Sequence, residues 1–249
     1  MTSGPEEIAI AVTRLKTGGL VAFPTETVYG LGADALDPAA VARIFALKGR
    51  PSNNPLIVHV SGEAMARAVV AQWTDQAQRL ASAFWPGPLT IVLPRAASVP
   101  DLVTGGGPTV AVRCPAHHVA LALLEAFGRP LVGPSANPSG RVSPTTAEHV
   151  RQAFTESQVY VLDGGACRAG IEFTVVTLAQ NPPQVFRAGV ISAGQIAKVL
   201  RCDVREAPPP HRDAAGGAAP PPADPPLPPP GPPPPHYPPT PPAGPLDAG

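Results

Sequence analysis

The stretch LVAFPTETVYGLGADALDPAAVARIFALK, residues 20–48, contains the alternation that decides the fold. Its first four residues, 20–23, are apolar and end at a proline, which is typical of a short buried strand. An Asp-Pro pair at residues 37–38 then predicts a helix N-terminus, and the apolar spacing that follows predicts a helix up to Lys48. The segment between them, residues 24–32, is polar and rich in glycine, so we expect a loop there.

The same alternation continues outward on both sides of this stretch. Further helices are expected around residues 8–15, within 63–84 as one or two segments, and at 116–127, 145–154 and 192–200. Further strands are expected at residues 56–60, 89–93, 109–113, 130–133, 159–162, 174–178 and 184–187. Strands that alternate with helices predict an α/β fold, with an open mixed sheet flanked by helices.

Proline divides the chain into two parts. Of the 37 prolines in the 249 residues, 20 lie within residues 207–249, which contain a single aromatic residue. Such a segment buries too little apolar surface to offset the entropy of ordering it. We therefore expect one globular domain at residues 1–206 and a disordered, Pro-rich tail at 207–249.

Charge, cysteines and hydropathy exclude several classes of protein. The 18 basic and 18 acidic residues cancel, which excludes a polycation, so any RNA contact would need a local basic patch. Cys114, Cys167 and Cys202 stand far apart, in no zinc-binding spacing. The first ten residues lack a basic signal-peptide region, and no apolar run approaches the ~18 residues of a membrane span. We expect a cytoplasmic protein with no membrane contact and no structural metal.

Polar residues gather in four connecting segments, residues 24–32, 48–55, 133–143 and 163–174. Lys48 and Arg50 place two positive charges beside serine and asparagine side chains, a combination suited to phosphate oxygens. We interpret them as lying in a polar loop, where substitution should leave the core intact. Ser135 and Asn137 offer further neutral donors. Neither a P-loop nor a GxGxxG fingerprint is present, so a nucleotide would bind by another device.

Two residues within predicted strands have two possible interpretations. His59 lies in an apolar strand, where a histidine is either a hydrogen-bonded core residue or a ligand. Arg113 ends another strand, and a buried arginine there needs a partner. Arg113 is accordingly either a structural ion-pair residue or a substrate ligand.

Five motifs follow one another in an order that resembles one family. They are FPTETVYGLGADAL at residues 23–36, IFALKGRPSNNPLIVHV at 44–60, FWPGPLTIVLP at 84–94, TVAVRCP at 109–115 and PLVGPSANPSGRVSPTT at 130–146. Over about residues 5–200 the chain resembles the YrdC-like family, the threonylcarbamoyl-AMP synthases.

The resemblance implies a fold, an activity and partners. The fold would be a twisted open sheet flanked by helices, with a positively charged concave cleft that could also bind double-stranded RNA. The activity would be the synthesis of L-threonylcarbamoyladenylate and pyrophosphate from L-threonine, bicarbonate and ATP. Mg²⁺ would arrive with the nucleotide, and a separate complex would transfer the threonylcarbamoyl group to adenosine 37 of tRNA.

The resemblance also implies site residues. The family's catalytic lysine, arginine, serine and asparagine correspond to Lys48, Arg50, Ser135 and Asn137. Its ATP contacts correspond to Arg50, Asn54, Thr109, Ser135, Ser143 and Arg187. Its threonine contacts correspond to Thr27, His59, Arg113, the backbone around Gly133, and position 173. These residue types suit phosphoryl transfer, which needs charge neutralisation and positioning more than a protein nucleophile.

Two departures from the family pattern stand out. Phe173 replaces a serine whose hydroxyl would contact threonine, so either threonine binds more weakly or the pocket is reshaped. Alternatively, the ring points into the core beside Val175 and leaves the site alone. The second departure is the tail, in which His236 and Tyr237 resemble a family linker that precedes a second domain, a domain that this sequence does not show.

Other functions remain open on the sequence. Phe173 is compatible with a catalytically weakened RNA- or nucleotide-binding module. The related carbamoyl-adenylate chemistry of hydrogenase-maturation carbamoyltransferases is disfavoured, because their acylphosphatase and zinc-finger segments are not found in this sequence.

Overall fold

The computed structural model describes residues 3–167 and 172–207. The chain divides into two units, residues 1–209 and 210–249, and every described residue belongs to the first. The Pro-rich tail predicted at 207–249 lies, apart from Ala207, outside the described residues.

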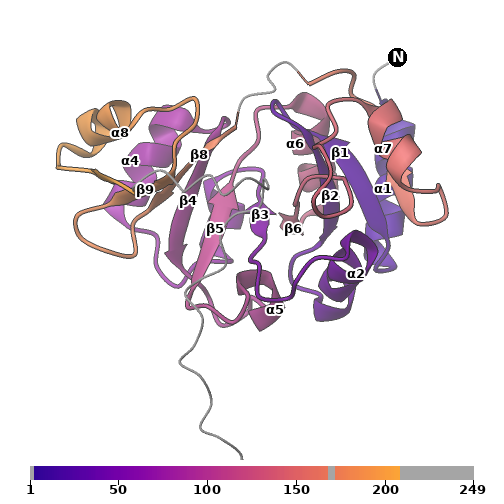
Figure 1. The fold of residues 1–249 in the computed structure, drawn as a ribbon, viewed down its shortest axis with the longest axis horizontal. Helices are drawn as coiled ribbons and strands as arrows, with labels where there is room; N and C mark the ends of the chain where they lie inside the picture. The colour runs from indigo at the N-terminus through magenta and orange to yellow at the C-terminus, as the bar shows by residue number, and fades with distance from the viewer. Residues whose placement is uncertain (1–2, 168–171, 208–249) are drawn as a thin grey trace, which may run out of the picture. The chain divides into compact units, whose positions relative to one another are not determined.

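The described residues form a ten-stranded mixed sheet with helices packed on it (Figure 1). The strand order is β10-β9-β8-β4-β5-β3-β6-β2-β1-β7. The strands are β1 Leu20–Pro24, β2 Tyr29–Asp34, β3 Ile57–His59, β4 Leu89–Pro94, β5 Thr109–Arg113, β6 Leu131–Val132, β7 Val159–Val161, β8 Thr174–Thr177, β9 Gln184–Arg187 and β10 Arg205–Glu206. The helices are α1 Pro5–Lys16, α2 Pro38–Lys48, α3 Glu63–Arg67, α4 Asp75–Phe84, α5 Asp101–Thr104, α6 His118–Phe127, α7 Ala147–Ala153 and α8 Ala193–Leu200.

Strand β1 is buried on both faces because its side chains alternate between two apolar clusters. Val21 and Phe23 pack with the apolar faces of α1 and α6. Leu20 and Ala22 belong to the larger cluster on the opposite face, which includes residues of α2. Figure 1 shows α1 and α6 near β1 at one end of the sheet, while α4 and α8 lie together near β4, β8 and β9 at the other end.

The predicted alternation of strands and helices is confirmed, and so is the mixed sheet. Helices α3 and α4 both lie within the segment predicted to be helical at 63–84. Residues 24–32 are only partly a loop, because β2 begins at Tyr29 and pairs with β1. Gly30 and Gly32 explain the difference, since a Cβ atom at either position would lie 3.0–3.1 Å from the ring of Phe23. These glycines therefore permit close packing of neighbouring strands rather than a turn.

The centre of the sheet places polar residues on one face. Strands β3 and β5 are parallel, with Ile57 beside Ala111 and His59 beside Arg113. Because side chains alternate along a strand, these residues share a face, whereas Val58 and Val112 join the core on the other. This face of β3 and β5 carries the candidate site. Within residues 3–167 and 172–207, no helix is long and apolar enough to cross a membrane.

Candidate active site

A cavity of about 200 Å³ collects most of the residues that the sequence analysis predicted for the site. It is lined by the loop after β1, by residues 55–59, by the loop after β6, and by residues just before β8 and at the end of β9. The predicted residues that line it are Thr27, Arg50, His59, Arg113, Gly133, Ser135, Ser143, Phe173 and Arg187. The structure thus brings together both the predicted threonine contacts and most of the predicted ATP contacts.

Arg113 is the most deeply buried charged residue of the cavity, with 1% of its surface exposed. Its Nη2 lies 2.7 Å from Oε1 of Glu26, and the same nitrogen donates to Thr27 Oγ1 at 3.4 Å. Its Nε donates to the Gly87 carbonyl at 3.4 Å. Burial lowers the pKa of the guanidinium, and Glu26 acts in the opposite direction. Arg113 is therefore a buried cation held in place by Glu26, and its Nη1 binds no described residue.

Glu26 is the partner that Arg113 needed, and the sequence analysis did not identify it. The signal was present, because Glu26 is the carboxylate of the polar segment 24–32. Its Oε2 accepts a hydrogen bond from the backbone N–H of Ala116 at 3.1 Å, so it also ties the loop after β1 to the segment after β5.

His59 is buried and held in the neutral state. Its Nε2 lies 3.2 Å from the Gly133 carbonyl, which can only accept, so Nε2 carries the proton. Burial, and then the charge of Arg113, lower the pKa of His59 to about 3. Its Nδ1 is buried without a hydrogen-bond partner among the described residues. Nδ1 is therefore a hydrogen-bond acceptor that no described residue uses.

Gly133 allows this approach of the imidazole. A Cβ atom at this position would lie 2.5 Å from Cδ2 of His59 and 3.0 Å from the ring of Phe23. Any side chain at residue 133 would displace the His59 ring or the loop after β6. Gly133 thus makes room for His59, and the contact of its backbone with threonine stays a prediction.

Acid is expected to destabilise the native chain more than the variant His59→Gln. Unfolded histidine binds a proton below about pH 6.5, whereas native His59 resists protonation down to about pH 3. The unfolded state therefore holds the extra proton between these values, and the free energy of unfolding falls as the pH falls, by about 1.4 kcal/mol per pH unit at most. Urea unfolding at pH 6.5 and 4.5 would measure it. Identical pH dependence in both proteins would show that His59 is not held neutral.

Arg50 is aimed by two backbone bonds. Its Nε donates to the Asn54 carbonyl at 3.2 Å and its Nη2 donates to the Pro55 carbonyl at 2.9 Å. These bonds leave Nη1 and one proton of Nη2 for a ligand in the cavity that Arg50 lines. Asn54 does not line the cavity; its described contact to Arg50 is through its main chain.

Lys48 is not in an exposed polar loop, and that interpretation was wrong. It is the last residue of α2 and only 4% exposed. Its ammonium donates to the carbonyls of Ser135, at 2.5 Å, and of Asn137. Burial, and then the nearby Arg50, lower the pKa of Lys48 to about 8. Lys48 does not line the cavity. Its bonds to two carbonyls instead stabilise the loop after β6.

The other two predicted residues outside the cavity occupy different places. Asn137 is buried, and its Nδ2 donates to the carbonyls of Pro138 and Arg141, which shapes the same loop. Thr109 begins β5 at the end away from Arg113. It shares a face with Arg113 by strand alternation, but it does not line the cavity. Direct substrate contact by Lys48, Asn54, Thr109 and Asn137 stays a prediction.

The variant Lys48→Met is expected to lower the free energy of unfolding by about 1–3 kcal/mol, because the buried carbonyls of Ser135 and Asn137 lose their donor. Chemical denaturation would measure it. The matched control is Lys16→Met, since Lys16 is exposed at the end of α1. Equal stability of native protein and Lys48→Met would contradict the structural role of this ammonium.

Phe173 lines the cavity, so its ring does not point into the core beside Val175. The guanidinium carbon of Arg187 lies 3.8 Å from the ring centroid, and that of Arg113 lies 4.3 Å from it. Arg187 also pairs with Glu172 at 3.1 Å. No local sequence pattern indicates that this ring contacts two predicted ligand residues. Gly170 and Ile171, which belong to the same motif, lie outside the described residues.

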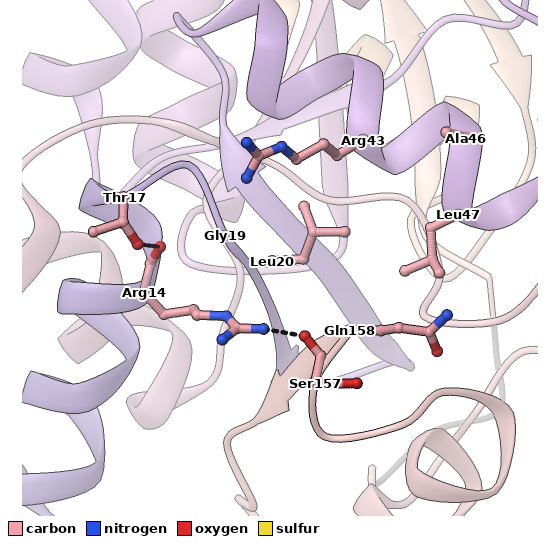
Figure 2. A pocket seen from close by; sticks show the side chains of 9 residues that line it. All are labelled: Arg14, Thr17, Gly19, Leu20, Arg43, Ala46, Leu47, Ser157 and Gln158. Carbon is pink, nitrogen blue, oxygen red and sulfur yellow. Dashed lines mark hydrogen bonds between the residues drawn. The ribbon is translucent and has the colours of Figure 1, made fainter.

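A second cavity, of about 620 Å³, contains none of the predicted site residues (Figure 2). Arg14 and Arg43 flank it, but both guanidiniums bind backbone carbonyls. Arg14 donates to Ser157 at 2.5 Å and Arg43 to Gly18 at 2.7 Å. These bonds connect the end of α1 to neighbouring segments. We therefore assign the two arginines a structural role and do not treat this cavity as the active site.

The protein also matches known proteins. The Sua5/YciO/YrdC family model, described as "Telomere recombination", matches residues 13–189. A threonylcarbamoyl-AMP synthase of Pyrococcus abyssi is 50% identical over 194 residues, which are 78% of this chain and 57% of that protein. One from Bacillus subtilis is 42% identical over 201 residues, 80% of this chain and 58% of that protein.

The crystal structure of P. abyssi Sua5 complexed with L-threonine has a TM-score of 0.80 at 46% identity. The similarity covers 86% of this chain and 63% of that one. The chain thus spans less than two thirds of the length of each of these relatives. Since the family model matches more than half of the chain and the fold agrees, the protein belongs to the Sua5/YciO/YrdC family.

Proposed function

We propose that the cavity over β3 and β5 makes L-threonylcarbamoyladenylate and pyrophosphate from L-threonine, bicarbonate and ATP. The observation that supports the proposal most strongly is that one cavity is lined by two sets of side chains, one suited to an amino acid and one suited to a nucleotide. Buried Arg113 and neutral His59 suit an amino acid, while Arg50, Ser135, Ser143 and Arg187 suit a nucleotide. Its relative from P. abyssi, complexed with L-threonine, supports the amino-acid half.

The amino-acid half has a complementary set of charges. A substrate carboxylate would accept hydrogen bonds from Nη1 of Arg113, because Nε and Nη2 already bind Gly87, Glu26 and Thr27. Thr27 Oγ1 lies 3.4 Å from Arg113 Nη2 and is a neighbouring polar group for the amino acid. His59 Nδ1 would accept a hydrogen bond from the amine or the hydroxyl of threonine. Since the pKa of His59 is about 3, this contact is a hydrogen bond to neutral imidazole, not an ion pair.

The proposed reaction has two steps, and the nucleotide half of the cavity stabilises the second. The threonine amine first combines with bicarbonate to give a carbamate and water. A carbamate oxygen then forms a bond to the α-phosphorus of ATP, and the bond from that phosphorus to the β-phosphate oxygen breaks, releasing pyrophosphate. Arg50 and Arg187 would neutralise the phosphate charge, and the hydroxyls of Ser135 and Ser143 would orient the oxygens.

Mg²⁺ is expected to arrive on the phosphates of ATP. Residues 3–167 and 172–207 contain no group of three or more His, Cys, Asp or Glu side chains placed to hold a metal ion. The cavity offers arginines and hydroxyls, which bind phosphate oxygens rather than cations. We therefore treat Mg²⁺ as part of the nucleotide substrate.

The chemistry of the proposed adenylate product indicates which class of reaction consumes it. A mixed anhydride of a carbamate and AMP is an activated acyl donor, so an acyl-transfer reaction must consume it. We propose that the acceptor is adenosine 37 of tRNA, reached through a separate transfer complex in the cytoplasm. Contact of this chain with double-stranded RNA is a prediction that only direct RNA-binding measurements can test.

Identification of the product tests the proposed function. The protein would be incubated with ATP, Mg²⁺, L-threonine and ¹³C-bicarbonate, and the products separated by mass spectrometry. We expect threonylcarbamoyladenylate with one ¹³C atom. Nucleotide binding without any labelled adenylate would instead support the alternative, a binding module that has lost turnover.

A further inference from the structure

One aromatic ring joins two arginines that come from distant strands. Arg113 ends β5 and Arg187 ends β9, and strands β4 and β8 lie between them in the sheet. Nevertheless, both guanidinium carbons lie over the Phe173 ring, at 4.3 and 3.8 Å from its centroid. Cations at these distances are attracted to the face of the ring.

The backbone holds Phe173 rigidly in this place. The next residue, Thr174, is fully buried, and its N–H donates to the Pro88 carbonyl at 2.9 Å. Its hydroxyl donates to the Ile191 carbonyl at 2.7 Å and accepts from the Ile191 N–H at 3.0 Å. Arg187 itself donates from Nε to the Phe173 carbonyl at 3.2 Å. These bonds fix the backbone at Phe173, whose ring lies against both guanidiniums.

Each arginine also has its own carboxylate. Arg113 pairs with Glu26, whose side chain is 17% exposed, and Arg187 pairs with Glu172, whose side chain is 64% exposed. Nη2 of Arg187 is buried without a hydrogen-bond partner among the described residues. Burial lowers the pKa of Arg187, Glu172 acts in the opposite direction, and the like charge of Arg113 adds a smaller lowering. A ring that attracts both cations reduces this conflict at the point where the two halves of the cavity meet.

We propose that Phe173 is a positioning residue that couples the binding of the amino acid to the binding of the nucleotide. This inference rests on the proposed function, in which Arg113 binds the carboxylate and Arg187 binds ATP. A carboxylate on Arg113 offsets its charge and fixes its guanidinium against the ring. With the charge of Arg113 offset, Arg187 is repelled less and stays against the ring. ATP then binds more tightly to Arg187. The serine of the family pattern has no aromatic face and could not do this.

The test measures coupling rather than affinity alone. L-Threonine would be titrated calorimetrically into the native chain, with and without a saturating, non-hydrolysable ATP analogue and Mg²⁺. The ratio of the two dissociation constants is the coupling factor, and we expect about fivefold or more for the native protein. Reciprocity requires the same factor for the analogue with and without threonine.

Two variants separate the ring face from simple packing. Phe173→Leu keeps apolar bulk but removes the aromatic face, and we expect its coupling factor to fall to within about twofold of one. Phe173→Tyr keeps the face and should retain the native factor. Thermal melting would confirm that both variants are folded.

The outcomes are distinct. Retention of coupling in Phe173→Leu, or its loss in folded Phe173→Tyr, would overturn the role of the ring. Native protein that binds both ligands with a coupling factor of one would also overturn it and leave the proposed function intact. Failure of the native protein to bind either ligand would instead count against the proposed function.

Discussion

Replacing Arg113 by glutamine is expected to reduce threonine-dependent pyrophosphate release by about ten- to a hundredfold. A charge-assisted contact contributes about 1.5–3 kcal/mol, and the carboxylate of the amino acid would lose a cation that is almost completely buried. The loss should appear mainly as a raised KM for threonine, with a smaller change in the KM for ATP, about the size of the coupling factor expected between the two sites. Steady-state kinetics with each substrate varied in turn would measure it.

The same substitution also leaves Glu26 without its cation, so folding must be checked. Arg113→Lys keeps the charge beside Glu26 but loses the planar guanidinium, and it should still reduce kcat/KM for threonine by about tenfold or more. Arg129→Gln is the matched control, because Arg129 is half-exposed and pairs with Asp34 away from the cavity. Native kinetics in folded Arg113→Gln would show that Arg113 is a structural ion-pair residue only.

Replacing Arg50 by alanine is expected to reduce adenylate formation about ten- to a hundredfold. The guanidinium is aimed at the cavity by its bonds to the carbonyls of Asn54 and Pro55, so its remaining protons are well placed for phosphate oxygens. The effect should fall on the ATP dependence, and threonine affinity should change much less. Pyrophosphate release at varied ATP would measure it.

Arg79→Ala is the control for this substitution, since Arg79 is exposed on α4 and does not line the cavity. Thermal melting of Arg50→Ala should stay close to native, because its guanidinium binds carbonyls of an exposed loop. Near-native turnover of Arg50→Ala, with ATP still required, would exclude this loop from phosphate binding.

The sequence predicted most elements because their local signals agree with their tertiary roles. The strand at residues 20–23 and the helix after Asp37 each carry their own pattern of apolar residues and caps. β2 was missed because its signal is not local. Gly30 and Gly32 weaken the strand pattern, and their neighbours on the paired strand, the Phe23 ring and the Val21 carbonyl, explain them.

The site shows the same limit. The resemblance indicated His59, Arg113 and Arg50, and the structure places all three around one cavity. The burial of Lys48 behind the loop after β6 depends on where α2 ends relative to β6, which no local pattern reports. The contact of Phe173 with two arginines likewise depends on the order of strands between β5 and β9.

The most direct test of the central claim, that this cavity joins an amino acid to a nucleotide, is pyrophosphate release from ATP. The native chain would be supplied with ATP, Mg²⁺ and bicarbonate, with and without L-threonine. The account predicts release that depends on threonine and is lost in Arg113→Gln. Pyrophosphate release that is equal with and without threonine, or no release in its presence, would contradict it.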